Sequence, residues 1–168
     1  DLLELSRLQS GTIALTKQRM DVQEILYDVA QRYESAAQER GLSIRLNVAD
    51  PFPEVYGNPD RTEQVLIILL DNAIKHGSAD EPLALGAEIS GDKVLVHVSN
   101  AGTIAEEDIA HLFERFYKAD RSHSGEGTGL GLSIAQEIMS LLDEKIWAQN
   151  RNGRVEFTFT LSLNAEKV

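Results

Sequence analysis

The sequence predicts an α+β fold: a two-layer sandwich in which about three helices cover one face of a mixed, mostly antiparallel sheet of about five strands. Two long segments, 22–40 and a run that begins at Pro59, carry apolar residues at helical spacing. Two pairs of alternating segments are joined by the short turns Gly91-Asp92 and "NRNG", which predict hairpins. Helices interleaved with hairpins favour a sheet with its helices on one side.

The chain opens in the middle of a helical pattern. In "DLLELSRLQSG" the leucines recur at helical spacing, and Gly11 is placed to end that helix. Because the pattern is already under way at Asp1, we interpret the chain as a piece of a longer protein.

The next elements follow from capping residues and alternation. Asp21 and Glu24 form a capping box that starts the helix 22–40. Alternating polar and apolar residues around this helix predict three strands, at 12–20, at 42–48 and, as a short piece, at Val55–Tyr56.

The second half begins with a helix that is expected to be buried. Asn58 is its cap and Pro59 its first residue, and the run Val65–Leu70 is apolar on all sides. A short helix around 106–112 and a longer one at about 130–142 follow. Strands are predicted at 82–90, 93–99, 145–149 and 155–163.

Composition limits the possible classes of function. The 168 residues suffice for one domain with a real core, and no stretch approaches the roughly 18 apolar residues of a membrane span. The absence of cysteine excludes disulfides and thiolate metal sites and fits the cytosol. A formal net charge of −11 argues against nucleic acid as a partner, so an anionic ligand must be recognised locally.

A glycine-rich segment directly precedes the last predicted helix. In "SGEGTGLGLSIAQEIM" (124–139) glycine stands at alternate positions, and the helical spacing of apolar residues begins at Leu130. The spacing fits neither GxxxxGK[ST] nor GxGxxG. The N–H groups at a helix start favour phosphate, but a flexible loop before a helix explains the segment alone equally well.

The buried helix carries polar residues near its end. Asn72 and either Lys75 or His76 follow Ile68 along one stripe of the helix. The amide oxygen of Asn72 is a suitable ligand for Mg²⁺, and the Lys75 amine is suited to phosphate. On these residues alone, the two groups could equally satisfy each other or reach solvent.

The segment "VSNAGTI" (98–104) ends a predicted strand at Asn100. A side chain that can accept a hydrogen bond is followed there by a small residue and Gly102, whose backbone a flat ligand can approach. Taken alone, the segment is also an ordinary Asn-Ala-Gly turn.

Four motifs in this order resemble the ATP-binding domain of bacterial sensor histidine kinases. They are the asparagine-bearing helix, the strand end "NAG", "LFERFYKAD" (112–120) and "GTGLGLSIAQEI" (127–138). The resemblance covers nearly all of residues 11–163 and includes "GNPDRTEQVL" and the final "FTFTLSL". It implies a Bergerat-type sandwich, the fold shared with gyrase-type ATPases, heat-shock chaperones and mismatch-repair ATPases.

The resemblance also implies ATP and Mg²⁺ as ligands and assigns roles to residues. Asn72 is similar to the asparagine that holds Mg²⁺, and it acts with Lys75 in catalysis, with His76 close to the phosphates. The other implied nucleotide-binding positions are Asn100 at the adenine amino group with Gly102 and Ile104 beside it, Phe113 and Phe116 in the F box that anchors a lid, Tyr117 and Lys118 in the lid, and Gly127, Thr128, Gly129, Leu130 and Gly131 at the lid hinge.

Three departures from the family pattern are visible. Ile68 stands where the family often has a second asparagine. Asn100 replaces an aspartate and so lacks the charge that strengthens a hydrogen bond. The first glycine box is shorter, since "NAGTI" lacks its second glycine. We expect ATP binding to survive these changes with modest affinity.

By resemblance, residues 1–11 are the truncated end of the dimerisation and phosphoacceptor helix, and residues 12–168 are the catalytic ATP-binding domain. No histidine lies in the family's phosphoacceptor motif, so the acceptor is expected on the upstream dimerisation domain. The implied partners are ATP and ADP, that upstream domain and the receiver domain of a response regulator. We expect a cytoplasmic part of a membrane-anchored, homodimeric sensor kinase, and a monomeric fragment.

The predicted function is therefore that of a protein-histidine kinase: transfer of the γ-phosphate of Mg-ATP to a histidine, for relay to a response regulator in two-component signalling. One alternative is a degenerate, nucleotide-regulated interaction module without phosphotransfer, which the Ile68 and Asn100 departures favour. A gyrase-type ATPase is a poorer alternative, because such enzymes commonly place a glutamate base where this chain has Ile68.

Overall fold

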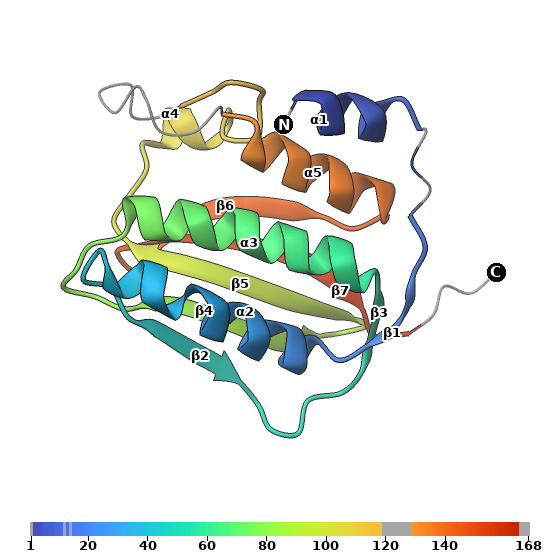
Figure 1. Ribbon diagram of the computed structural model, residues 1–168, viewed down its shortest axis with the longest axis horizontal. Coiled ribbons are helices and arrows are strands. Elements are labelled where there is room, and N and C mark those ends of the chain that lie inside the picture. The colour runs from blue at the N-terminus through green and yellow to red at the C-terminus, as the bar shows by residue number, and fades with distance from the viewer. Residues whose placement is uncertain (1, 12, 14, 119–128, 165–168) are drawn as a thin grey trace.

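The computed structural model describes residues 2–11, 13, 15–118 and 129–164, and these form two layers (Figure 1). The helices are α1 (Leu2–Gln9), α2 (Val22–Gln38), α3 (Pro59–His76), α4 (Glu106–Ile109) and α5 (Gly131–Leu141). The strands are β1 (Gln18–Met20), β2 (Ile44–Val48), β3 (Val55–Gly57), β4 (Leu83–Ser90), β5 (Lys93–Ala101), β6 (Ile146–Arg151) and β7 (Arg154–Ser162).

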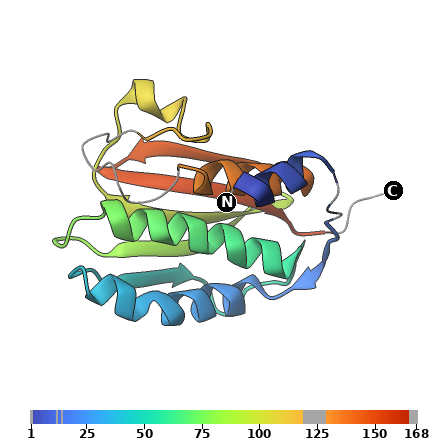
Figure 2. The same cartoon turned by 45° about the horizontal axis from the view of Figure 1, so that its top comes forward.

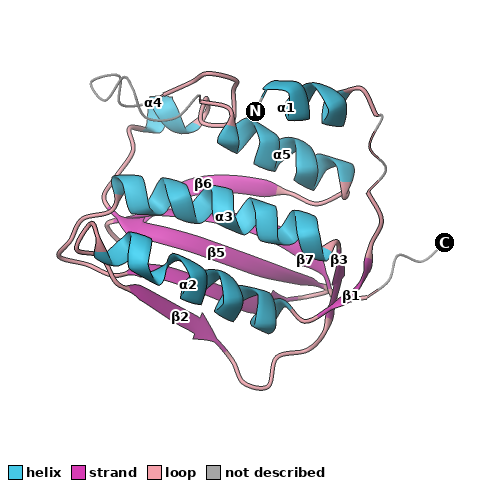
Figure 3. Ribbon diagram, viewed as in Figure 1, coloured by secondary structure: helices cyan, strands magenta, loops and turns pink. Residues whose placement is uncertain are grey.

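The described strands form one seven-stranded sheet in the order β1-β3-β7-β5-β4-β2, with β6 also paired to β7. The pair β2–β4 is parallel, and the other pairs are antiparallel. The helices α2, α3 and α5 cover one face of this sheet (Figure 3). The predicted α+β sandwich with a mixed, mostly antiparallel sheet is confirmed. Among the described residues seven strands form, one at each of the seven segments that the sequence indicated as extended, although the sheet was expected to hold about five.

The helix α3 lies at the centre of the helical layer. Its start is fixed by Asn58, whose side chain accepts a hydrogen bond from the Arg61 N–H at 2.9 Å. Its apolar residues are packed on several sides, and the fully buried ones are Val65, Leu66, Leu69 and Leu70. Burial on several sides fits the wholly apolar run Val65–Leu70, which lies between polar residues at the two ends of the helix.

The helix α1 packs on α5 (Figure 2). Its Leu5 and Leu8 are fully buried, and Gly11 ends it with a φ of +73°. The carboxylate of Glu4 accepts a hydrogen bond from Gln64 on α3. This short segment therefore belongs to the packed helical layer of the structure.

Three predicted boundaries differ from the structure. The first strand covers only Gln18–Met20, because β3, its partner, is equally short. The helix expected around 106–112 ends at Ile109. The turn read as "NRNG" is only Asn152-Gly153, with φ values of +53° and +74°, and Asn150 and Arg151 lie in β6. Among the described residues, no helix is both long and apolar enough to cross a membrane.

Candidate nucleotide-binding site

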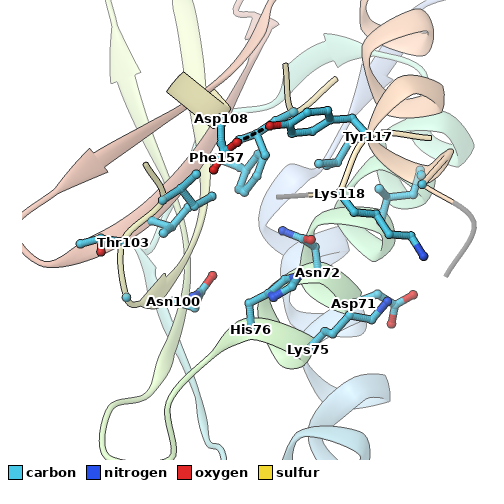
Figure 4. Close-up of a pocket in the computed structure, with 18 of the residues that line it drawn as sticks. Asp71, Asn72, Lys75, His76, Asn100, Thr103, Asp108, Tyr117, Lys118 and Phe157 are labelled. Carbon is cyan, nitrogen blue, oxygen red and sulfur yellow. Dashed lines mark hydrogen bonds between the residues drawn. The ribbon is translucent and has the colours of Figure 1, made fainter. Parts of the chain in front are cut away.

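A pocket of about 570 Å³ lies where the C-terminal ends of α3 and β5 meet the start of α5 (Figure 4). Its walls are partly apolar, with Leu112, Val155 and Phe157 among the lining residues. Ten of the residues predicted from the sequence line it: Asn72, Lys75, His76, Asn100, Gly102, Ile104, Tyr117, Lys118, Gly129 and Gly131. Segments from four parts of the chain thus meet around one space.

Five of the predicted residues are not among the residues that line the pocket. Gly127 and Thr128 lie outside the described residues. Leu130, the N-cap residue of α5, is 3 % exposed and belongs to the hydrophobic core. Phe113 lies behind the pocket wall, where its ring meets the Phe157 ring edge to face, with centroids 6.1 Å apart. The Phe116 side chain is instead exposed to solvent.

The α3 end of the pocket carries most of its charge. Asn72, Lys75 and His76 come from the last two turns of α3, and Lys118 approaches from the other side (Figure 4). Asp71 also lines the pocket here. Partial burial raises the pKa of the Asp71 carboxyl above its ordinary value, and the Lys75 ammonium only partly offsets this. This end of the pocket thus combines two ammonium groups, which suit an anion, with the Asp71 carboxylate and the Asn72 amide, whose oxygen suits a cation.

The β5 end of the pocket is built around Asn100. This residue is 3 % exposed, and its Nδ2 donates a hydrogen bond to the Ala101 carbonyl at 3.0 Å. The amide oxygen is then the atom that faces the pocket (Figure 4). Gly77 allows the end of α3 to come this close to the sheet, since a Cβ there would lie 2.9 Å from the Ala73 carbonyl and from Leu83.

The two stretches that flank residues 119–128 meet at Phe116 and Gly129. The Phe116 N–H donates to the Gly129 carbonyl at 2.9 Å, and both residues have positive φ, +62° and +75°. A Cβ on Gly129 would lie 2.6 Å from the Phe116 Cα. Glycine at 129 is therefore required both by its backbone conformation and by the close contact. Gly131 is different, because a Cβ there would lie 3.4 Å from Ile68.

Sequence reasoning missed several residues of the pocket region. The Tyr117 hydroxyl donates a hydrogen bond to Asp108 on α4, and both line the pocket (Figure 4). Asn150 on β6 binds the backbone of Ile104, at 2.9 Å and 2.7 Å. No sequence pattern singles out Asp108 or Asn150. Asp108 is one of three acidic residues in the first turn of α4, and Asn150 was expected to lie in a turn.

A mixed, mostly antiparallel sheet covered by helices on one face holds this pocket, which joins an asparagine-bearing helix, an Asn-Ala-Gly strand end and a glycine-rich helix start. This is the arrangement expected of a sandwich ATPase of the Bergerat type. A model of the histidine kinase-, DNA gyrase B- and HSP90-like ATPase family matches residues 57–165. The chain belongs to this family.

Its relatives are sensor kinases. The sensor protein VanS of Enterococcus faecium is 28% identical over 163 residues, which are 96% of this chain and 42% of VanS. The Acinetobacter baumannii histidine kinase AdeS has a TM-score of 0.80 at 27% identity, covering 98% of this chain and 76% of that one. Full-length ShkA in complex with AMPPNP has a TM-score of 0.84 at 27% identity, covering 98% and 35%. The chain thus spans less than half the length of VanS.

Proposed function

We propose that this chain is the catalytic domain of a histidine kinase, which binds Mg-ATP and transfers its γ-phosphoryl group to a histidine. The observation that carries the proposal is that one pocket has two different ends. The end at β5 is apolar and holds the Asn100 amide, oriented by its bond to Ala101, whereas the end at α3 holds the Asn72 amide beside lysine ammonium groups. ATP has the same two parts, a flat base and a charged tail.

The β5 end suits the adenine base. Its apolar residues Val155 and Phe157 offer surface to a flat ring. The Asn100 oxygen can accept a hydrogen bond from an exocyclic amino group. Because Asn100 is neutral, this bond is weaker than one to a carboxylate, and we expect modest affinity.

The α3 end suits the phosphates and Mg²⁺. The Asn72 amide oxygen is the proposed protein ligand of the ion, since Mg²⁺ prefers oxygen ligands and is usually held by few protein groups together with phosphate oxygens. Lys75 is proposed to place its charge at the phosphates, with Lys118 approaching from the lid side. Phosphoryl transfer depends mainly on such positioning and charge neutralisation.

The acceptor and the later partner lie outside this chain. The γ-phosphoryl group would pass to a ring nitrogen of a histidine on the upstream dimerisation domain, leaving ADP, and then to the receiver domain of a response regulator. Family membership and the sensor-kinase names of the relatives support this order of transfer. A homodimeric, membrane-anchored parent with this domain in the cytoplasm remains part of the same proposal.

The test is calorimetric titration of ATP with and without Mg²⁺, on the wild-type chain and on Asn72→Ala. We expect Mg²⁺ to strengthen ATP binding to the wild type, and the variant to lose this gain, about tenfold or more in affinity. Asn47→Ala, on the remote strand β2, is the matched control and should behave as wild type. Equal heats for wild type and Asn72→Ala would reject the metal role.

The second candidate, a nucleotide-regulated module without phosphotransfer, is favoured by one observation. Ile68 lines the pocket next to Asn72, so an apolar side chain stands beside the proposed metal ligand. Addition of ATP to the full-length protein separates the candidates. Acid-labile phosphate on histidine supports the kinase, and ATP binding without it supports the module.

A further inference from the structure

The loop that joins β5 to α4 forms one wall of the pocket. Its residues Gly102, Thr103, Ile104 and Ala105 all line the space. From Gly102 to Ala105 the backbone is neither helix nor strand. Its N–H and C=O groups therefore need partners from elsewhere in the molecule.

Asn150 on β6 supplies those partners at Ile104. The Asn150 Oδ1 accepts a hydrogen bond from the Ile104 N–H at 2.9 Å, and its Nδ2 donates to the Ile104 carbonyl at 2.7 Å. The same Nδ2 donates to the Glu106 carboxylate at 3.2 Å, in the first turn of α4. One side chain thus binds both polar groups of a loop residue, as a neighbouring strand would.

The opposite end of the loop is bonded to the same hairpin. The Gly102 N–H donates to the Gly153 carbonyl, in the β6–β7 turn, at 3.0 Å. Beyond the loop, α4 carries Asp108, which accepts a hydrogen bond from the Tyr117 hydroxyl at the pocket (Figure 4). The β6–β7 hairpin therefore holds the wall, and through α4 it also affects the side chain of Tyr117.

We propose that Asn150 is a positioning residue for the base end of the nucleotide. It does not line the pocket itself and acts through Ile104, holding the loop next to Asn100 so that both contact one flat ligand. This inference rests on the proposed function. Because the loop lies at the β5 end, Asn150 affects contacts to the nucleoside and not those to the phosphates.

The experiment measures the affinities of AMP, ADP and ATP by calorimetry for the wild type and Asn150→Ala. Loss of the two bonds to Ile104 is expected to weaken binding about tenfold. The factor should be the same for all three nucleotides, because they share the nucleoside. Gln149→Ala is the control, since that side chain donates to Glu156 instead and its loss should change no affinity.

Each outcome decides the proposal. Equal affinities for Asn150→Ala and wild type would overturn it, even if the melting temperature falls, because a merely structural role lowers stability alone. A loss that grows with the number of phosphates would also overturn it. If Asn150→Ala does not fold, Asn150→Asp replaces it, since it keeps the acceptor and loses the donor. Absence of nucleotide binding to the wild type would instead reject the proposed function.

Discussion

The carboxylates of Glu144, in a structural cluster, and of Asp71, in the pocket, have pKa values shifted in opposite directions. Glu144, after α5, is 7 % exposed and accepts hydrogen bonds from Lys93 at 2.7 Å and from Thr160 and Ser162 at 2.8 Å each. Burial alone would raise its pKa, but these partners lower the pKa below its ordinary value. At Asp71 burial prevails and the pKa is raised.

The two pKa shifts differ in sign because Glu144 has several hydrogen-bond donors around it, whereas Asp71 faces the open pocket. Around Glu144 the chain itself supplies these donors, from β5 and β7, so the buried charge ties these strands to the end of α5. At the pocket, the Asn100 oxygen and the Asp71 carboxylate lie beside open space. The polar groups around Glu144 bond to one another within the fold, whereas the Asn100 oxygen faces the pocket and can accept a hydrogen bond from a ligand.

The largest expected effect is on stability at the Glu144 cluster. Glu144→Gln removes the charge that pairs with Lys93 and Lys17, and we expect the free energy of unfolding to fall by about 2 kcal/mol. Urea denaturation measures this change. ATP affinity of the folded variant should equal that of the wild type, and a weaker affinity would contradict the separation of the two regions.

The pH dependence of stability adds a second signature to this variant. Because the folded-state pKa of Glu144 is lowered, its contribution is fully present above the unfolded carboxyl pKa of about 4.3 and is lost as the pH falls through the folded-state pKa. The difference in unfolding free energy between wild type and Glu144→Gln should therefore be constant near neutral pH and shrink in acid. A constant difference down to pH 3 would contradict this.

The smallest expected effect is at Asp71. Since folding raises its pKa, the folded state disfavours its charged form, and Asp71→Asn should slightly increase the unfolding free energy at pH 7. The effect is small because the Asp71 side chain is exposed and solvent screens its charge. Removal of a negative charge at the cationic end should also tighten ATP binding while AMP binding changes less. Calorimetry measures both affinities, with Glu63→Gln on the same helix as control. Weaker ATP binding by Asp71→Asn would show that the carboxylate serves the ligand.

Much of the fold was predictable from the sequence because its signals are local. The cap at Asn58, the apolar run of α3 and the strict alternation of β7 each determine an element by themselves. The length of β1 was not predictable, since a strand ends where its partner ends and β3 is short. Likewise, the turn at Asn152-Gly153 depends on the register of β6 with β7.

The candidate site was predictable only as far as its residues have a recurring pattern. Asn72, Asn100 and Gly129 lie in such patterns, and the structure brings them to one pocket. Asn150 and Asp108 act through contacts between elements distant in the sequence, which spacing alone does not encode. Leu130 was assigned to the nucleotide from its place in the glycine-rich pattern, and its burial in the core was not visible in that pattern.

The central claim is that one pocket holds the base at β5 and the phosphates at α3. Backbone amide chemical shifts of the labelled chain, recorded with AMP and then with Mg-ATP, test it directly. We predict that AMP shifts the signals of Asn100, Gly102 and Ile104, and that Mg-ATP shifts those of Asn72 and Lys75 in addition. Shifts confined to the opposite face of the sheet, or identical shifts with both nucleotides, would contradict the account.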